Sequence, residues 1–225
     1  VALPPSMLKP GDNTVTISGK VRVVFNTGNG QKWLDASNSA SMSFTIKVDP
    51  SLQPPQLQLS VTPSQSEVTI TTDNSGNLIY TPSSITHTVK PAKVSNMTVP
   101  AGFKVKRLEF VIDKDNSRVS SATTPDYTES YDTTATTITS FSQSKSFSYN
   151  TTYIQPGKTG TPAYYGKVRY VVADSNGNEY TSGWSTIAPV QATVTTKVLD
   201  PTQPTVNAMS DDKITLTMTS GTSWT

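Results

Sequence analysis

The 225-residue sequence contains no cysteine and one histidine, and charged residues make up only 15% of it. Without cysteine the chain cannot form disulfides, iron–sulfur clusters or thiolate zinc sites. A single histidine also excludes the common catalytic zinc designs, which combine several histidine or cysteine ligands. A Ser-His-Asp triad would have to use His87, but no nucleophile-elbow motif lies near it, so we interpret His87 as a surface histidine on a strand.

The sequence also lacks the features of membrane-spanning, nucleic-acid-binding and glycoside-hydrolysing proteins. No apolar run is long enough to span a membrane, so we expect no membrane insertion. The net charge is +2 and the basic residues are scattered, whereas nucleic-acid binding needs a concentrated basic face, so we expect no nucleic-acid partner. Glycoside hydrolysis needs two facing carboxylates, and the sequence favours no pair among its glutamates. We therefore predict no catalytic residue, no cofactor-binding residue and no enzyme activity.

Serine, threonine and asparagine supply the polarity instead, and 16 prolines and 12 glycines interrupt the chain at short intervals. This composition is typical of strands and turns, and no segment shows a long helical period, so the predicted fold class is all-β. Alternating apolar and polar residues predict strands at 56–62, 67–72, 78–90, 103–112, 164–172 and about 190–199.

An internal repeat is the strongest feature of the sequence. Residues 19–24 (GKVRVV) recur as residues 166–171 (GKVRYV), with an offset of 166 − 19 = 147 residues. Three further blocks recur in the same order: 8–11 with 154–157, 47–50 with 197–201, and 67–71 with 213–217. The alternation keeps its phase, and a slip by one residue would turn every side chain to the other face. The copies are therefore predicted to share a fold.

The repeat predicts three parts of the chain. Residues 1–50 match the C-terminal part of a repeat unit, residues 51–200 form one complete unit, and residues 201–225 match the start of a further unit. Within the complete unit, the Ser/Thr-rich insertion 117–152 forms either a long loop or an extra hairpin. We expect an excerpt of a longer array in which the two partial units do not form complete domains unaided. The alternative is a polymer whose incomplete ends complete one another by strand donation.

Residues 165–177 (YGKVRYVVADSNG), followed by 182–185 (SGWS), resemble the F-to-G hairpin of fibronectin type III domains. The repeat unit is longer than such a domain, so an immunoglobulin-like sandwich with an insertion at 117–152 fits better. The resemblance implies tandem immunoglobulin-like β-sandwich modules, similar to those of bacterial surface adhesins and of bacteriophage tails and fibres. It implies display and spacing, not chemistry. The lack of cysteine favours a prokaryotic or viral source, because animal extracellular immunoglobulin domains usually carry an inter-sheet disulfide.

Two acidic turns are candidates for a calcium site. Asp113 and Asp115 lie two residues apart in one predicted turn, and Asp174 begins another turn at 174–178. Calcium takes several hard oxygen ligands, so either turn can contribute some of them. No full EF-hand loop is present, and plain hairpin turns are the simpler interpretation. Calcium is the one cofactor that the sequence suggests.

Three aromatic residues are candidates for stacking against sugar rings: Trp33, Trp184 and Tyr180. Trp33 falls opposite Tyr180 at the offset of 147, which suggests an equivalent role in each unit. The alternative is that these aromatic side chains pack between sheets.

Proline-rich linkers follow Asp49 and Asp200, and units that contact only their neighbours form a stiff rod. We therefore predict a structural or adhesive spacer module of an extended cell-surface protein or filament, located outside the cell, on its surface or on a virion. The alternatives are a bacteriophage tail or fibre component, a carbohydrate-binding module, and a subunit of a strand-exchanged polymer. The expected partners are other copies of the module in the same or neighbouring chains, and a cell-surface glycan or host receptor.

Overall fold

The computed structural model confirms the all-β fold class, since strands make up most of the chain and helices very little of it. The structure describes the backbone of residues 7–20, 22–35, 39–73, 75–201, 205–210, 213–217 and 220–223. Side chains are described within these ranges up to residue 199, apart from Phe25, Thr27, Lys32, Trp33 and Asp35. In this part of the chain, none of the helices has the length and apolar character that crossing a membrane requires.

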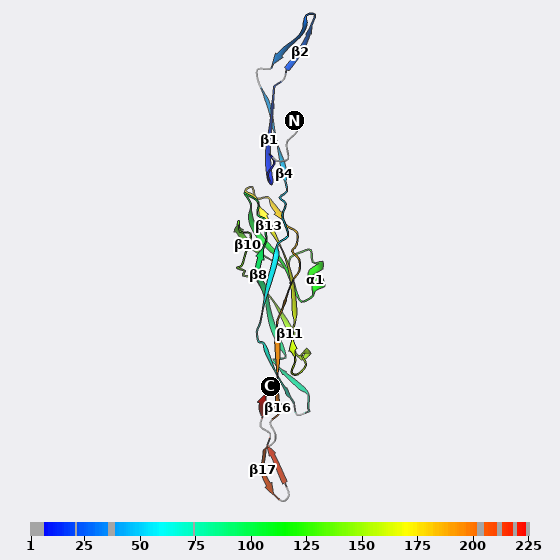
Figure 1. Ribbon diagram of the computed structural model, residues 1–225, viewed down its shortest axis with the longest axis vertical. Helices are drawn as coiled ribbons and strands as arrows, with labels where there is room; N and C mark the ends of the chain where they lie inside the picture. Colours follow the sequence, from blue (N-terminus) through cyan, green and yellow to red (C-terminus); the bar gives the residue numbers. More distant parts are fainter. Residues whose placement is uncertain are drawn as a thin grey trace.

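The central unit, residues 51–200, consists of strands that run roughly along the long axis of the molecule (Figure 1). Its elements are β5 (Gln56–Pro63), β6 (Glu67–Thr72), β7 (Leu78–Thr81), β8 (Ser84–Ser95), β9 (Lys104–Asp113), α1 (Asn116–Ser121), β10 (Tyr127–Thr133), β11 (Lys145–Asn150), a 3-10 turn (Thr151–Tyr153), β12 (Thr159–Gly160), β13 (Ala163–Ala173), β14 (Glu179–Thr181), β15 (Ala188–Gln191) and β16 (Val194–Pro201). One sheet has the order β10-β9-β13-β14, with β15 also paired to β13. A second has the order β11-β8-β5, and a third has the order β12-β16-β6-β7.

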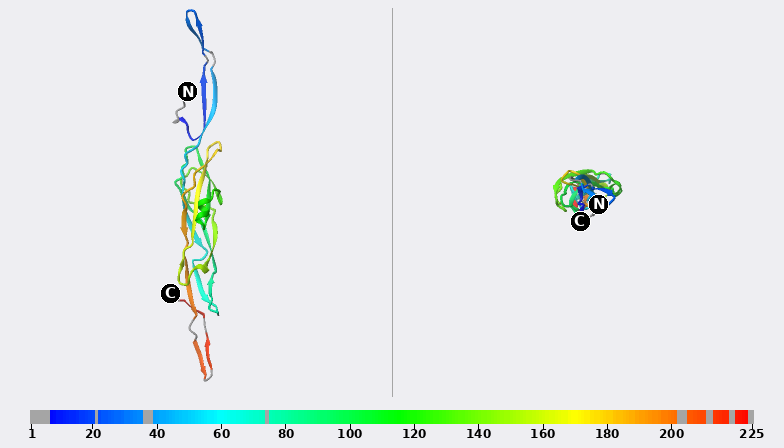
Figure 2. Two further views of the ribbon diagram at one scale, coloured as in Figure 1. Left: turned by 90° about the vertical axis from the view of Figure 1, so that its right-hand side faces the viewer. Right: turned by 90° about the horizontal axis from the view of Figure 1, so that it is seen from above.

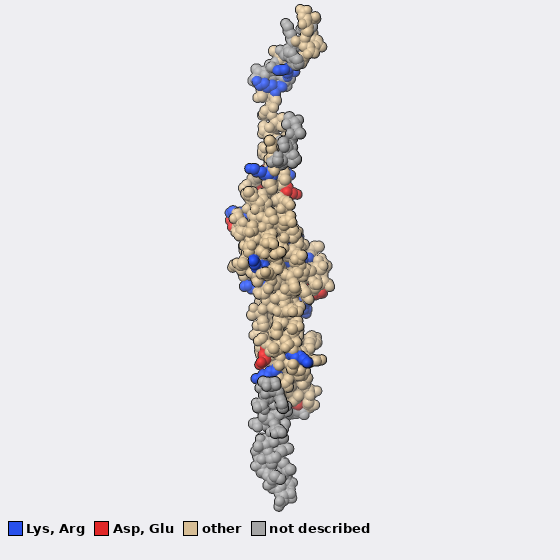
Figure 3. Space-filling model, viewed as in Figure 1, with Lys and Arg blue, Asp and Glu red and all other residues tan. Residues whose placement is uncertain are grey.

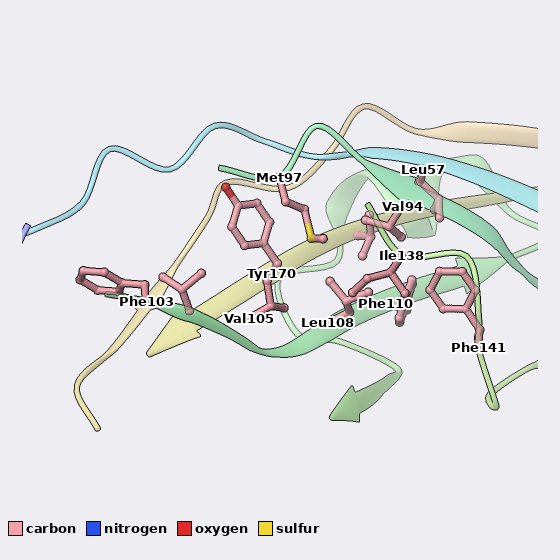
Figure 4. Packing of buried hydrophobic residues seen from close by; sticks show 12 residues of the cluster. Leu57, Val94, Met97, Phe103, Val105, Leu108, Phe110, Ile138, Phe141 and Tyr170 are labelled. Carbon is pink, nitrogen blue, oxygen red and sulfur yellow. The ribbon is translucent and has the colours of Figure 1, made fainter. Parts of the chain in front are cut away.

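Three clusters of buried apolar side chains hold these sheets together. The largest joins β9 and β13 of the first sheet to β5 and β8 of the second, and Figure 4 shows their side chains converging on one layer. Phe110 and Tyr170 are fully buried in this cluster. The second cluster joins β6, β8 and β16, and the third joins β8, β9 and β13. Strand β8 contributes to all three clusters, so it ties the sheets into one unit.

The N-terminal part is a narrow ribbon that projects from one end of the central unit along the long axis (Figures 1 and 2). In it, β1 (Gly11–Gly19) pairs with β4 (Ala40–Val48), and β2 (Arg22–Thr27) pairs with β3 (Gly30–Asp35), both antiparallel. Their counterparts in the central unit pair in the same pattern, β12 with β16 and β13 with both β15 and β14. The repeated sequence therefore forms the same antiparallel hairpin in both places.

The C-terminal residues pair differently from their counterparts. There, β17 (Thr205–Ser210) and β18 (Lys213–Thr217) form a two-stranded sheet beyond the other end of the central unit, and β19 (Ser220–Ser223) pairs with β16 (Figure 1). By the repeat, β17 and β18 correspond to β5 and β6. In the central unit those two strands belong to different sheets, because β8 holds β5 while β7 and β16 hold β6.

Two segments of the central unit differ in detail from the sequence-based expectation. The strand expected at about 190–199 is two strands, β15 and β16, which belong to different sheets. Segment 117–152, expected as a loop or an extra hairpin, contributes β10 and β11, but β10 pairs with β9 and β11 with β8. Each strand lies at an edge of its sheet, and its alternate side chains are half-buried. These half-buried side chains are the aromatic residues Tyr127, Tyr131, Phe147 and Tyr149, together with Glu129, Thr133 and Lys145.

The proline-rich segment after Asp49 lies against the central unit. Pro55 is buried, Leu52 packs against the largest apolar cluster, and the carbonyl oxygen of Gln53 accepts a hydrogen bond from the Tyr170 hydroxyl at 3.0 Å. The segment is therefore docked on the unit, which fixes the direction in which the chain enters it.

Candidate functional site

The repeated motif lies on β13 in the central unit, and its glycine occupies a crowded position. A Cβ atom on Gly166 would lie 3.1 Å from Leu59 Cδ1 and 3.2 Å from both Ile112 Cγ1 and the Val111 carbonyl oxygen. Ordinary contacts between carbon atoms are about 3.5–4.0 Å. Strands β5, β9 and β13 approach one another so closely here that only glycine fits without a shift.

The lysine of the motif closes the end of helix α1. Lys167 Nζ donates hydrogen bonds to the carbonyl oxygens of Ala122 at 2.7 Å and Ser120 at 3.1 Å. Carbonyl groups at a helix C-terminus have no intrahelical partners, so a lysine there satisfies them. The Lys167 side chain is buried although it points away from the apolar core, and this burial lowers its pKa.

The arginine of the motif joins a network around a buried carboxylate. Arg169 Nε donates to Glu109 Oε2 at 2.7 Å, and Arg107 Nε donates to Glu109 Oε1 at 2.8 Å. Arg107 also pairs with Glu179, which connects the network to β14. Burial alone would raise the pKa of Glu109, but the hydrogen bonds from the two arginines outweigh it and hold the pKa below its ordinary value. The carboxylate stays charged and links β9 to β13.

The first copy of the motif lies on the ribbon in very different surroundings. Ile17 and Val23 are 39% and 44% exposed, whereas their counterparts 147 residues later, Tyr164 and Tyr170, are 2% and 0% exposed. Val24 is 43% exposed, and its counterpart Val171 is fully buried. Val21 lies outside the described residues. The ribbon thus presents, to solvent, apolar positions that form the interior of the central unit.

Backbone conformation is repeated even where burial is not. Gly11 has φ of 94° and its counterpart Gly157 has φ of 72°, while Gly30 and Gly177 have φ of 109° and 82°. Side chains with a Cβ atom avoid this left-handed region, so glycine is needed at these turns in both copies. Local sequence therefore specifies the turns of each copy without help from its surroundings.

A polar junction connects the ribbon to the central unit. Asn178 Nδ2 donates to Asp12 Oδ2 at 3.2 Å, and Lys47 Nζ donates to Asn178 Oδ1 at 3.3 Å. A Cβ atom on Gly11 would lie 3.4 Å from Phe103 Cζ and 3.5 Å from Asp174 Oδ2, so the ribbon packs closely on the unit there. These contacts lie at the base of the ribbon.

The three calcium candidates do not lie together. Asp113 ends β9 and pairs with Arg118 at 3.3 Å, Asp115 caps α1 by accepting from the Ser117 N–H, and Asp174 lies beyond the opposite end of the β9–β13 ladder. The Asn178 side chain and neighbouring backbone N–H groups lower the pKa of Asp174. Among the described residues, no three histidine or acidic side chains are grouped so that they would hold a metal ion.

The aromatic candidates also lie apart. Trp184 lies beside the outer face of β13, where Arg169 Cζ is 4.4 Å and Lys167 Nζ is 5.1 Å from its ring centroid. Tyr180 packs on the inner side against Phe103, with ring centroids 5.6 Å apart. Trp33 pairs with Val24 in the β2–β3 ladder, and its side chain lies outside the described part of the chain.

The interpretation of His87 as a surface histidine is wrong. The side chain is fully buried on β8, where Nδ1 is hydrogen-bonded to the Tyr164 hydroxyl and the ring stacks on Tyr149. Its Nε2 has no partner among the described residues, and burial lowers the pKa of the ring. The neighbouring threonines misled the sequence-based interpretation, because they lie on the opposite face of the strand.

Sequence comparison adds no known relative. No protein-family model matches the chain, and no curated protein matches it.

Sequence reasoning missed that the motif makes specific contacts between strands. The available signal was that glycine, lysine and arginine recur at fixed spacing. A strand requires only that apolar and polar side chains alternate, and this alternation does not explain why these three residue types recur. The contacts join strands and satisfy carbonyl groups at a helix end.

Proposed function

We propose that the chain is a segment of an array of immunoglobulin-like β-sandwich modules, and that it acts as a structural spacer of an extended protein on a cell surface or virion. One observation carries this proposal. The same motif forms an inner strand of the central unit and also lies on a ribbon that projects along the long axis of that unit (Figure 2).

The connection between the two parts supports a spacer. The linker after Asp49 is docked through Pro55 and through the hydrogen bond between Tyr170 and Gln53, so the ribbon leaves the unit in a defined direction. A docked proline-rich connection resists bending more than a flexible linker does. On the face shown in Figure 3, most of the described surface is uncharged, and lysine and arginine side chains are spread along it.

The aromatic residues favour a spacer over a carbohydrate-binding module. Sugar binding uses an open aromatic face, whereas the Trp184 ring is stacked against Arg169 and Lys167, and Tyr180 packs against Phe103. A glycan array with the intact chain tests this choice, and Trp184→Ala is the matched variant. Specific glycan binding that disappears in Trp184→Ala would contradict the spacer proposal.

Immunogold electron microscopy of the native source tests the proposed function directly. Antibodies raised against this chain are expected to label projections outside the cell or on virions, at a distance from the envelope or capsid. Labelling of intact virions would assign the array to a tail or fibre, and labelling of cells to a surface protein. Label confined to the cell interior would overturn the proposal.

A strand-exchanged polymer is the second candidate, because the ribbon exposes apolar residues. It predicts that the isolated chain assembles into long polymers as its concentration rises, whereas the spacer predicts a monomer or small oligomers. Analytical ultracentrifugation over a hundredfold range of concentration distinguishes the two.

A further inference from the structure

The ribbon carries a glycine whose identity its own surroundings do not require. A Cβ atom on Gly19 would meet nothing within 4 Å, whereas its counterpart Gly166 is surrounded by Leu59, Ile112 and Val111. In sequence, Lys20 and Arg22 match Lys167 and Arg169, whose partners lie on α1 and β9. A glycine at this open position is explained if the ribbon meets the same kind of partner as β13.

One edge of the ribbon is positioned to receive that partner. In the central unit, β13 is paired on one side with β14 and β15 and on the other side with β9. The ribbon reproduces the first side through β3 and β4, and in the described residues its strands form two-stranded sheets only. The edge that corresponds to the β9 side of β13 is therefore open for a strand.

We propose that the ribbon is the last part of a second unit, and that it is covered by a polypeptide segment equivalent to residues 51–153. A β9-like strand pairs antiparallel with residues 19–24, as β9 pairs with residues 166–171. This inference rests on the proposed function, because it requires neighbouring units of the same kind.

The register of that pairing follows from the central unit. Arg169 is opposite Glu109, Tyr170 is opposite Leu108, and Gly166 is opposite Ile112. The incoming strand therefore places a glutamate opposite Arg22, an aliphatic residue opposite Val23, and another against Gly19. A helical turn after the strand supplies carbonyl groups for Lys20, as α1 does for Lys167.

The C-terminal segment of a second copy fits this edge less well. Residues 205–217 match β5 and β6, and in the central unit neither of these strands pairs with β13. The apolar counterparts of the exposed ribbon residues are covered mainly by β9 and β8, which this segment does not match. The observations therefore favour a β9-like strand as the occupant.

A fusion protein provides the test. Residues 51–153 are placed directly before Leu8 of the chain, so that Leu8 takes the position of its counterpart Ile154. Hydrogen exchange is then followed by mass spectrometry in peptides that cover residues 17–27. We expect exchange there to slow by roughly a hundredfold or more relative to the original chain, because the ribbon becomes part of a cooperative unit.

Gly19→Val is the matched control. In the fusion it is expected to restore fast exchange in residues 17–27, because the position becomes as crowded as Gly166. In the original chain it is expected to leave exchange unchanged. Exchange in residues 17–27 that stays at the original rate in the fusion overturns the proposal, whether or not the added segment folds.

Engineered cysteines report the register even if the second unit is only marginally stable, and the chain has no cysteine of its own. Val23→Cys is combined with Leu108→Cys in the added segment, and the control pair uses Lys106→Cys in place of Leu108→Cys. Oxidation is expected to cross-link the first pair at least tenfold faster than the second. Equal rates would overturn the proposed pairing.

Immunogold labelling does not depend on the pairing of the ribbon. Its result therefore separates failure of this inference from failure of the spacer function.

Discussion

The ribbon and the β12–β16 region of the central unit share sequence motifs and hairpin pairing, but they differ in what surrounds them. On β13 the motif lies between β9 and the outer strands, and its glycine, lysine and arginine each make a specific contact. On the ribbon the equivalent apolar residues are exposed. Local sequence therefore specifies strands and turns, whereas burial is specified by segments distant in the sequence.

Paired substitutions at equivalent positions test this comparison, and the largest difference is expected for the core tyrosine. Tyr170→Ala should lower the free energy of unfolding by about 4 kcal/mol, because it leaves a large cavity and removes the partner of the Thr98 N–H. Val23→Ala on the ribbon should change it by less than about 0.5 kcal/mol. Urea denaturation followed by circular dichroism measures both values. A comparable loss in Val23→Ala would show that the ribbon is already packed.

The motif glycine should give the next largest difference. Gly166→Val forces its neighbours on β5 and β9 apart and should cost about 2–3 kcal/mol. Gly19→Val meets open space and should cost less than about 0.5 kcal/mol in the same urea experiment. Equal costs at the two positions would contradict the difference in crowding.

Removal of the motif arginine tests the charged network. Arg169→Ala should cost about 2 kcal/mol, because buried Glu109 loses one of its two guanidinium partners. The cost should shrink when Glu109→Gln is also present, which a double-mutant cycle measures. Additive effects in the cycle would indicate that the two residues do not interact.

Acidification should produce the smallest effect, and only in the central unit. Burial lowers the pKa of His87, so the unfolded chain binds a proton more readily than the folded one. Stability is therefore full above a pH of about 6.5 and falls as the pH drops below that value.

Denaturation midpoints at pH 7 and pH 5 measure this effect, with His87→Phe as the control that should remove most of it. The chain has no other histidine. Burial would raise the pKa of Asp126, but Arg118 and Lys145 hold it at about 2, so this carboxylate stays charged across the window. A midpoint that does not move in the original chain would contradict a neutral buried His87.

Much of the fold was predictable because strand periodicity and turn residues are local signals. The strands at 56–62, 67–72 and 164–172 are confirmed as β5, β6 and β13 within one residue at each end. Segment 117–152 was not predictable in the same way. Its strands β10 and β11 pair with strands of different sheets. Which strand each of them pairs with depends on which sheet edges are available in the folded unit.

The candidate site was less accessible from sequence. Alternation placed Lys167 and Arg169 away from the core, but it gave no sign that α1 covers Lys167 or that Glu109 lies between two arginines. The buried state of His87 depends on Tyr164 and Tyr149, which are distant in the sequence. Such contacts follow from the packing of sheets, which single-strand patterns do not contain.

The direction of the strands has a mechanical consequence. Hydrogen bonds in an antiparallel ladder are perpendicular to the strands, and β9 and β13 run roughly along the long axis of the molecule (Figure 1). Tension applied along that axis would shear the ladder and load many of its hydrogen bonds at the same time. An array of such units would therefore be suited to bear a pulling force without unzipping bond by bond.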